Sequence, residues 1–195
     1  QPRLLVGVAQ EIADGHTPPR TVSKRFDYVE ITPDGHTRPS GPAPYLDYDP
    51  VPDLHATQAV LHQSWLADNP EELATTWAIT EGSVAHRTEV SERISAQTAK
   101  TRDQVRRRLT DEINYWDARA LDLSDQERMG RTLKVSAATA NARARNLETR
   151  LAKRLHELDE DAALTVRPPV TTALALVLPA GLLADNPAAP HHTVG

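Results

Sequence analysis

Apolar positions recur at steps of three and four through the middle of the chain, whereas they alternate or form short runs near both ends. Steps of three and four are typical of a helix that buries one face. The pattern predicts a helix over about residues 84–121, which would be about 50 Å long. Its apolar seam consists of Val90, Ile94, Thr98, Thr101, Val105, Leu109, Ile113, Trp116 and Ala120.

The segment from Leu121 to Ser124 interrupts this pattern. Ser124 is followed by Glu127 at the spacing of a capping box, so a second helix is predicted from Asp125 to about Asp161. Two long helices joined by a tight turn run antiparallel and bury their apolar faces on each other. The second seam consists of Ala137, Ala140, Ala144, Leu147, Leu151, Leu155 and Leu158.

Proline is absent from this whole region. All 15 prolines lie at or before Pro70 or at or after Pro168, and a proline inside a helix removes a hydrogen bond and clashes with the preceding turn. The sequence Asn69-Pro70-Glu71-Glu72 combines a capping side chain, a proline suited to the first turn and two acids. It predicts the start of a shorter helix that runs to about Gly82.

The two ends of the chain predict a small β-containing base. Residues 25–31 alternate aromatic or β-branched residues with charged ones and predict a strand, and Pro33-Asp34-Gly35 predicts a hairpin turn. Residues 1–14 fit either a strand or a helix. Five prolines between 39 and 52 favour an edge strand or an ordered loop. Residues 54–66 read as a helix, and residues 171–178 as a strand that returns to pair with the hairpin strands.

Together these patterns predict an α+β fold in which a long antiparallel helical hairpin, a coiled-coil arm, is inserted in a small antiparallel β-containing base. The base, with a β-hairpin and one helix, covers residues 1–69. The arm covers residues 70–162 and folds back near 121–125. Residues 163–184 return as a strand that completes the base, and 185–195 form a flexible tail.

Charge is distributed unevenly between these parts. The chain has a net charge of −5, yet residues 86–161 carry 16 Lys and Arg against 14 Asp and Glu, a net +2, which leaves −7 for the remainder. Cysteine is absent, which excludes disulfides and thiolate metal sites and agrees with a cytoplasmic protein. No apolar run approaches the roughly 20 residues that span a bilayer, so no membrane partner is expected. Because the chain begins at Gln1, without methionine and within an apolar run, we expect it to be part of a longer polypeptide; processing that removes a methionine is the alternative.

The arginines of the arm form the main candidate functional feature. A fold at residues 123–124 would place residue 105 opposite about residue 142 and would bring Arg143 and Arg145 level with the arginines around it. Such a basic band suits contact with nucleic-acid phosphates or with an acidic partner; alternatively, long arginine stems cover a thin coiled coil and reach into water. The candidate contact residues are Arg102, Arg106, Arg107, Arg108, Arg143, Arg145, Arg150, Lys153 and Arg154.

No catalytic, metal-binding or cofactor-binding residue is predicted from local motifs. The chain has no glycine-rich phosphate loop ending in Lys-Ser or Lys-Thr. The run Asp159-Glu160-Asp161-Ala162 is similar to a helicase metal-binding box, but it lacks the preceding apolar strand and fits a solvated helix end better. Asn114-Tyr115-Trp116-Asp117 is the most aromatic part of the arm, and packing against the following helix is favoured over base stacking.

Several segments, in order, resemble the region that follows the motor in bacterial SNF2-type helicases, such as the SNF2-like helicase of DISARM anti-phage systems. The resemblance covers about residues 3–183. It rests on RFDYVEI (25–31), PYLDY (44–48), RLTDEINYWDARA (108–120), RNLETR (145–150), PPV (168–170) and ALVLP (175–179). Members of this family couple ATP hydrolysis to movement on nucleic acid. The resemblance implies a motor upstream in the same polypeptide that binds ATP and Mg²⁺, and none of its catalytic residues falls in this chain.

Three functions are consistent with these observations. The leading hypothesis is a non-catalytic accessory domain of a SNF2-family ATP-dependent helicase, whose arm contacts DNA or another subunit of a defence complex. The alternative is a protein-interaction or spacer module without nucleic-acid contact. A third reading, a stand-alone enzyme, would require a polar pocket in the base near Asp27, Glu30, Asp47 or Asp49.

Overall fold

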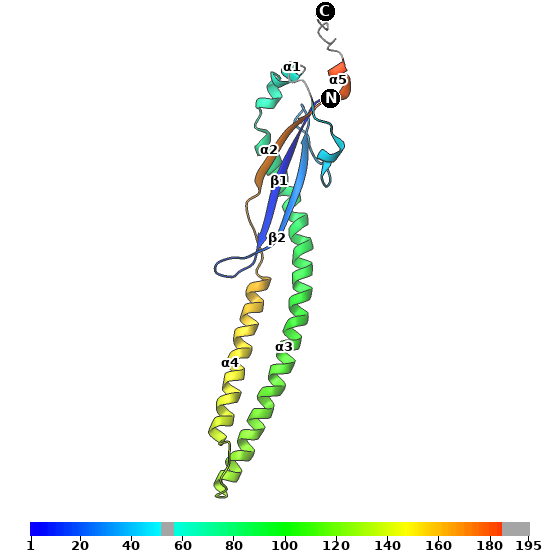
Figure 1. Cartoon of the computed structure of the whole chain (residues 1–195). Helices are drawn as coiled ribbons and strands as arrows, with labels where there is room; N and C mark the ends of the chain where they lie inside the picture. Colours follow the sequence, from blue (N-terminus) through cyan, green and yellow to red (C-terminus); the bar gives the residue numbers. More distant parts are fainter. Residues whose placement is uncertain (52–56, 185–195) are drawn as a thin grey trace, which may run out of the picture. The chain divides into compact units, whose positions relative to one another are not determined.

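The computed structural model describes residues 1–51 and 57–184 and shows an α+β protein with an antiparallel sheet of five strands and a long helix (Figure 1). The chain divides into two compact units. The first comprises residues 1–12, 22–87 and the described residues from 166 onward, and the second comprises 13–21 and 88–165. The predicted tail, 185–195, lies outside the described residues.

β1 (Arg3–Ala13) is the central strand of the sheet, which settles the choice that the sequence leaves open for residues 1–14. The strand order is β3-β2-β1-β4, with β2 at Thr21–Ile31, β3 at Thr37–Pro39 and β4 at Thr165–Val166. β5 (Val170–Val177) pairs with β1 in antiparallel register, and not with β2 or β3 as predicted. β1 is buried along nearly its whole length, as expected of an apolar strand with partners along both edges.

The hairpin predicted after residue 31 is confirmed. β2 and β3 pair in antiparallel register, and Gly35 in the connecting turn has a φ of +79°, a conformation that glycine adopts without strain. Within the proline-rich stretch that follows, β3 is a short edge strand and Pro44–Asp47 forms a single 3₁₀ turn, η1.

The single helix predicted over 54–66 is wrong for its described part. α1 covers only Gln58–Leu61, and a separate 3₁₀ helix, η3, covers Ser64–Ala67. Gln63 between them is extended, with a ψ of 136°, so its backbone cannot continue a helix. Residues 54–56 lie outside the described residues.

The core of the first unit is the contact between the sheet and α2 (Pro70–Trp77). Its buried members alternate along the strands, so that they share one face of the sheet. Trp77 brings the largest side chain from the helix, and its indole nitrogen donates to Glu81 Oε2 at 3.1 Å. The cluster consists of Leu4, Val6 and Val8 from β1, Val29 and Ile31 from β2, and Ala74, Trp77 and Ala78.

α2 begins at Pro70 as predicted, but Asn69 does not cap it through its side chain. Asn69 takes a left-handed conformation with a φ of 43°, and its amide nitrogen donates to Glu72 Oε2 at 3.0 Å. The proline and the first-turn acids of this start signal are in the expected places.

The helix that starts at Pro70 continues without a break to Arg128, so both predicted interruptions, at Gly82 and at 121–125, are wrong. A π-turn, η4 (Ala78–Gly82), links α2 to α3 (Ser83–Arg128), and the Ser83 backbone N–H donates to the carbonyl of Ala78, five residues earlier. Gly82 serves a close approach: a Cβ there would overlap Gln10 Nε2 and lie 3.1 Å from the Trp77 ring.

The turn between the long helices lies at 129–136, later than predicted. Gly130, with a φ of 76°, ends α3: its N–H donates to the Glu127 carbonyl at 2.9 Å, and the Arg131 N–H to the Gln126 carbonyl at 3.1 Å. This is the pattern of a Schellman motif, which favours glycine at the left-handed position.

α4 (Ala137–Ala162) begins with two side-chain caps. Ser136 Oγ accepts from the Thr139 N–H at 3.1 Å, and Glu127 Oε1 accepts from the Ala137 N–H at 2.9 Å. The predicted capping box at Ser124 is therefore wrong, because Glu127 caps the helix that starts ten residues after it.

α3 and α4 contact each other at two levels within the second unit. Far from the turn, Arg102 Nη2 donates to Asp159 Oδ1. Near the turn, the two helices share a buried cluster of Ala120, Leu123, Ala137 and Ala140, with Trp116 and Leu133 packed against it. These pairs define the register of the two helices.

The two serines provide a direct test of where α4 begins. Ser136→Ala should lower the free energy of unfolding of the second unit by about 1 kcal/mol, because the Thr139 N–H loses its acceptor. Ser124→Ala, in the interior of α3, should leave it unchanged or slightly raised, because alanine favours helix more than serine does. Urea unfolding followed by helical circular dichroism measures both; a larger loss for Ser124→Ala would contradict the observed turn.

Candidate functional site

A groove with a strongly basic lining lies between α3 and α4 in the second unit. Its volume is about 350 Å³. Val105 and Leu109 give it an apolar floor, and charged side chains from both helices surround this floor. The lining residues are Val105, Arg108, Leu109, Arg150, Lys153, Arg154 and Glu157.

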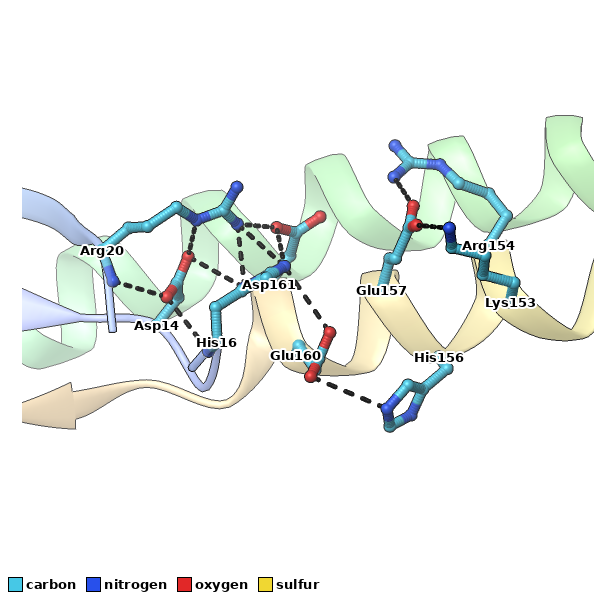
Figure 2. A network of polar contacts seen from close by, with 9 residues as sticks. All are labelled: Asp14, His16, Arg20, Lys153, Arg154, His156, Glu157, Glu160 and Asp161. Carbon is cyan, nitrogen blue, oxygen red and sulfur yellow. Dashed lines mark hydrogen bonds and ion pairs between the residues drawn. The ribbon is translucent and has the colours of Figure 1, made fainter. Parts of the chain in front are cut away.

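Four of these side chains are cationic, and Glu157 is the acid among them. Arg154 Nη1 donates to Glu157 Oε2 at 2.7 Å, and Lys153 Nζ lies 4.0 Å from Glu157 Oε1 (Figure 2). The hydrogen bond from Arg154 and the nearby positive charges lower the pKa of Glu157. Glu157 therefore stays ionised and offsets one of the four positive charges, which leaves the lining of the groove at +3.

The arginines at 106–108 in α3 are exposed, and Arg108 is the one of them that lines the groove. Arg108 Nε pairs with Glu112 on the same helix at 3.3 Å, and Arg107 Nε donates to the Asp103 backbone carbonyl at 3.4 Å. Arg106 and Arg150 have no ion-pair partner within the described part of the chain. Ion pairs between exposed side chains are weak, so these cations can exchange their partners for an external anion.

Arg102, another of the candidate contact residues, forms an ion pair between the two helices. Its side chain is only 29% exposed and is paired with Asp159. Asp159 belongs to the run that was predicted to form a solvated helix end. The pair lies across α3 and α4, so the guanidinium of Arg102 is committed to holding the two helices together.

Arg143 and Arg145 do not lie level with residue 105, so that part of the predicted basic band is wrong. The Arg143 guanidinium lies over the Trp116 ring, 4.5 Å from its centroid. The physical reason is the position of the turn, because moving it from 123–124 to 129–136 slides α4 along α3. As a result Arg150, Lys153 and Arg154 take the place that Arg143 and Arg145 were predicted to occupy.

Trp116 packs as predicted. It contacts the buried cluster that α3 and α4 share, and its ring meets that of Tyr115 edge-on at 5.3 Å between centroids. Tyr115 itself is 62% exposed.

A second polar network, missed at sequence level, joins the loop after β1 to the end of α4 within the second unit (Figure 2). Asp14 is 2% exposed, and its carboxylate accepts from the Arg20 backbone N–H at 2.9 Å and from Arg20 Nε at 2.7 Å. Arg20 Nη2 also donates to Asp161 Oδ1 at 2.6 Å. The ring of His16 also belongs to this network: it lies 3.2 Å from Asp14 Oδ2 and 3.6 Å from Glu160 Oε2.

Burial alone would raise the pKa of Asp14, but the hydrogen bonds from the Arg20 backbone, the Arg20 side chain and the His16 N–H outweigh it, so its pKa is lowered. Ligand atoms of Asp14, His16 and Asp161 all lie within 4.8 Å of one another, close enough for one metal ion. The guanidinium of Arg20, however, already contacts all three residues. We therefore assign this network to loop anchoring, with Arg20 as its cation.

Gly15 is the residue in the loop after β1 whose type reflects the contact of this loop with the end of α4. Its N–H donates to the Glu160 carbonyl at 2.9 Å, and a Cβ at this position would lie 2.8 Å from the Cβ of Ala163. Glycine is thus required by a close approach of two backbones. The partner, however, lies more than 140 residues later, and no local pattern points to it.

The acids considered for an enzyme are mostly engaged in structural pairs. Glu30 is buried and accepts from Arg38, Ser40 and Tyr48, while Asp27 accepts from Gln10 and Arg25. Burial alone would raise the pKa of Glu30. The hydrogen bonds from Arg38 and Ser40 and the charge of Arg3 outweigh burial, so the pKa of Glu30 is lowered. Asp47 and Asp49 instead line a separate groove of about 500 Å³ beside β1 and β5.

The two buried carboxylates predict how stability depends on pH. Since the pKa values of Asp14 and Glu30 are lowered by folding, their stabilisation is present above their ordinary pKa and is lost as pH falls through the folded-state values. The free energy of unfolding should stay level from about pH 7 to 5 and decrease below about pH 4, by at most about 1.4 kcal/mol per pH unit for each carboxylate. Urea unfolding at each pH measures this decrease, and the double variant Asp14→Asn, Glu30→Gln should reduce it. An equal decrease in the double variant would assign it to other groups.

Comparison with protein-family models, curated proteins and solved structures finds no match for this chain. Among the described residues, no helix is both long and apolar enough to cross a membrane.

Proposed function

We propose that this chain is a non-catalytic accessory module whose long helices contact the phosphate backbone of nucleic acid. In this proposal α3 and α4 form an antiparallel coiled-coil arm that extends from a small β-containing base. The basic groove between the two helices carries the proposal. It combines Arg108 from α3 with Arg150, Lys153 and Arg154 from α4 around one acid.

Electrostatics favours phosphate as the ligand of this groove. Arginine and lysine bind phosphate oxygens through charge-assisted hydrogen bonds, and each neutralised phosphate releases counterions into solution. The chain as a whole has a charge of −5, so binding would depend on the local cluster and not on a general basic field. The groove has no aromatic lining residue, which supports contact with the backbone over stacking of bases.

The family resemblance supplies the context of the proposal. It supports a place after the motor of a SNF2-type helicase, where the base docks on the motor and the arm reaches DNA or a neighbouring subunit of a defence complex. ATP and Mg²⁺ would be bound by the motor and not by this chain.

Fluorescence anisotropy with labelled duplex and single-stranded DNA tests the proposal. The expected result is saturable binding at about 50 mM salt that weakens by at least tenfold at about 200 mM, because several phosphates are neutralised. Absence of binding to both DNA forms at the lower salt concentration would overturn the nucleic-acid role.

One observation favours the alternative, a protein-interaction module without nucleic-acid contact. β5 is a strand of eight residues without a charged side chain, and Val170 and Leu174 on it are 61% and 51% exposed. Exposed apolar strands at a sheet edge suit the addition of a strand from a partner. This alternative predicts that a β5 variant, Leu174→Lys, loses a subunit in pull-down experiments, while DNA binding is absent or unaffected by changes in the basic groove.

A further inference from the structure

A third groove, in the first unit, lies where the π-turn leads into α3. It has a volume of about 380 Å³ and is separate from the basic groove and from the anchor around Asp14. Two segments distant in sequence form it: the helical stretch from Ile79 to Arg87 and the stretch from Val166, the last residue of β4, to Pro169. The lining residues are Ile79, Ser83, Val84, Arg87, Val166, Arg167, Pro168 and Pro169.

Ser83 is the buried residue of this lining, with 8% exposure. Its hydroxyl has no hydrogen-bond partner among the described residues. A serine or threonine inside a helix commonly donates to the carbonyl four residues earlier, as Thr80 does to Thr76 at 3.0 Å, but Ser83 does not. A buried hydroxyl without a partner destabilises the fold, so a ligand that accepts a hydrogen bond there would be favoured.

Two arginines give the groove a positive rim. Arg87 is exposed and has no ion-pair partner within residues 1–51 and 57–184. Arg167 is fixed in place, because its backbone N–H donates to the Glu11 carbonyl at 2.9 Å and its Nη1 lies 3.4 Å from Glu11 Oε2. Lys24 also pairs with Glu11, at 2.9 Å, so Glu11 is shared between two cations.

The remaining walls are apolar. Ile79 and Val84 are 56% and 58% exposed, although both are branched aliphatic side chains, and Pro168 and Pro169 also line the groove. Apolar walls with a few convergent polar groups are typical of sites for small organic ligands, and the volume falls in the range of such sites.

From these observations we infer that the groove binds a small organic carboxylate with an apolar body. The carboxylate pairs with Arg87 and accepts from the Ser83 hydroxyl, while the apolar body covers Ile79, Val84 and the two prolines. This site does not depend on the nucleic-acid proposal, because its residues belong to the other compact unit.

Titration with 4-phenylbutyrate, followed by amide chemical shifts of the full chain, tests the inference. We expect saturable binding with a Kd below about 1 mM and the largest shifts at residues 79–87, 166 and 167. The neutral analogue 4-phenylbutyramide should bind at least tenfold more weakly, because it cannot pair with Arg87. Equal affinity of the two compounds, absence of saturation, or shifts confined to other residues would each overturn the inference.

Variants separate the site from general charge attraction. Arg87→Gln should weaken 4-phenylbutyrate binding about tenfold and Ser83→Ala about threefold to tenfold, whereas Arg145→Gln, a matched change on the exposed face of α4, should have no effect. A peptide with a C-terminal phenylalanine forms a further arm of the experiment. Tighter binding of this peptide than of 4-phenylbutyrate would overturn the assignment to a small molecule and identify a chain terminus as the occupant.

Discussion

Replacing Arg108, Arg150 and Lys153 together by glutamine is expected to weaken DNA binding about 30-fold near physiological salt. The estimate follows from three lost phosphate contacts at about 0.5–1 kcal/mol each. The slope of log affinity against log salt should become less negative by about 2.7, because about 0.9 counterion is released for each phosphate neutralised on duplex DNA. Anisotropy titrations over a salt series measure both quantities.

A matched control carries the same charge change elsewhere on the second unit. Arg119, Arg128 and Arg131 lie near the turn, and the first two pair with Asp122 and Asp125 on their own helix. Their triple replacement by glutamine should change affinity by less than threefold. Equal losses in the two triple variants would mean that DNA responds to net charge alone, and the basic groove would lose its special role.

Gly82→Ala is expected to lower the free energy of unfolding of the first unit by about 2 kcal/mol, which is the scale of overpacking in a well-packed interior. An added methyl would overlap Gln10 Nε2 and crowd the Trp77 ring. Relief requires Gln10 to move, yet its amide donates to Asp27 Oδ2 at 2.6 Å, and Asp27 is also bound by Arg25. Arg25 in turn donates to the Gly82 carbonyl at 2.7 Å, so a single shift disturbs several bonds.

The sign of this effect is diagnostic. An ordinary glycine-to-alanine change inside a helix stabilises it by up to about 1 kcal/mol. Gly181→Ala provides the control, since Gly181 lies in α5 (Ala180–Ala184) and a Cβ there meets no atom within 4 Å. Urea unfolding should show stabilisation or no change for Gly181→Ala and a loss for Gly82→Ala. A gain for Gly82→Ala would show that the helix does not need the close approach seen at the π-turn.

Hydrophobic period and proline positions were enough to predict the α+β class and a helix of unusual length. They did not reveal where that helix ends. A glycine at position 82 predicts a helix break, but the missing side chain of Gly82 instead allows close packing against Gln10. Ser124 and Glu127 have the spacing of a capping box, but a spacing does not say which amide the carboxylate will reach. Gly130 was the informative glycine, because only there does the backbone adopt a positive φ within this region.

The cationic residues of α3 and α4 could be predicted from the sequence, whereas the residues that lie next to them on the other helix could not. Which arginines of α3 and α4 lie side by side depends on the turn between them, and an error of several residues in the position of that turn changes every pair. Networks such as Asp14 with Arg20 and Asp161 join segments 141 positions apart. Their members look like ordinary loop and helix-end residues, so local patterns carry no information about the pairing.

The double capping at the turn has a consequence for how this chain tolerates length changes. The Schellman motif at Gly130 and Arg131 and the caps from Ser136 and Glu127 hold both helix ends without hydrogen bonds from residues 132–135. Adding a residue among 132–135 should therefore be absorbed locally. Adding one residue to α3 or α4, between the turn and the basic groove, would rotate the part of that helix beyond the insertion by about 100°. The four cations of the basic groove would then no longer lie around one groove. Homologous chains that keep the groove should vary in the turn and conserve the two helix lengths that lead to it.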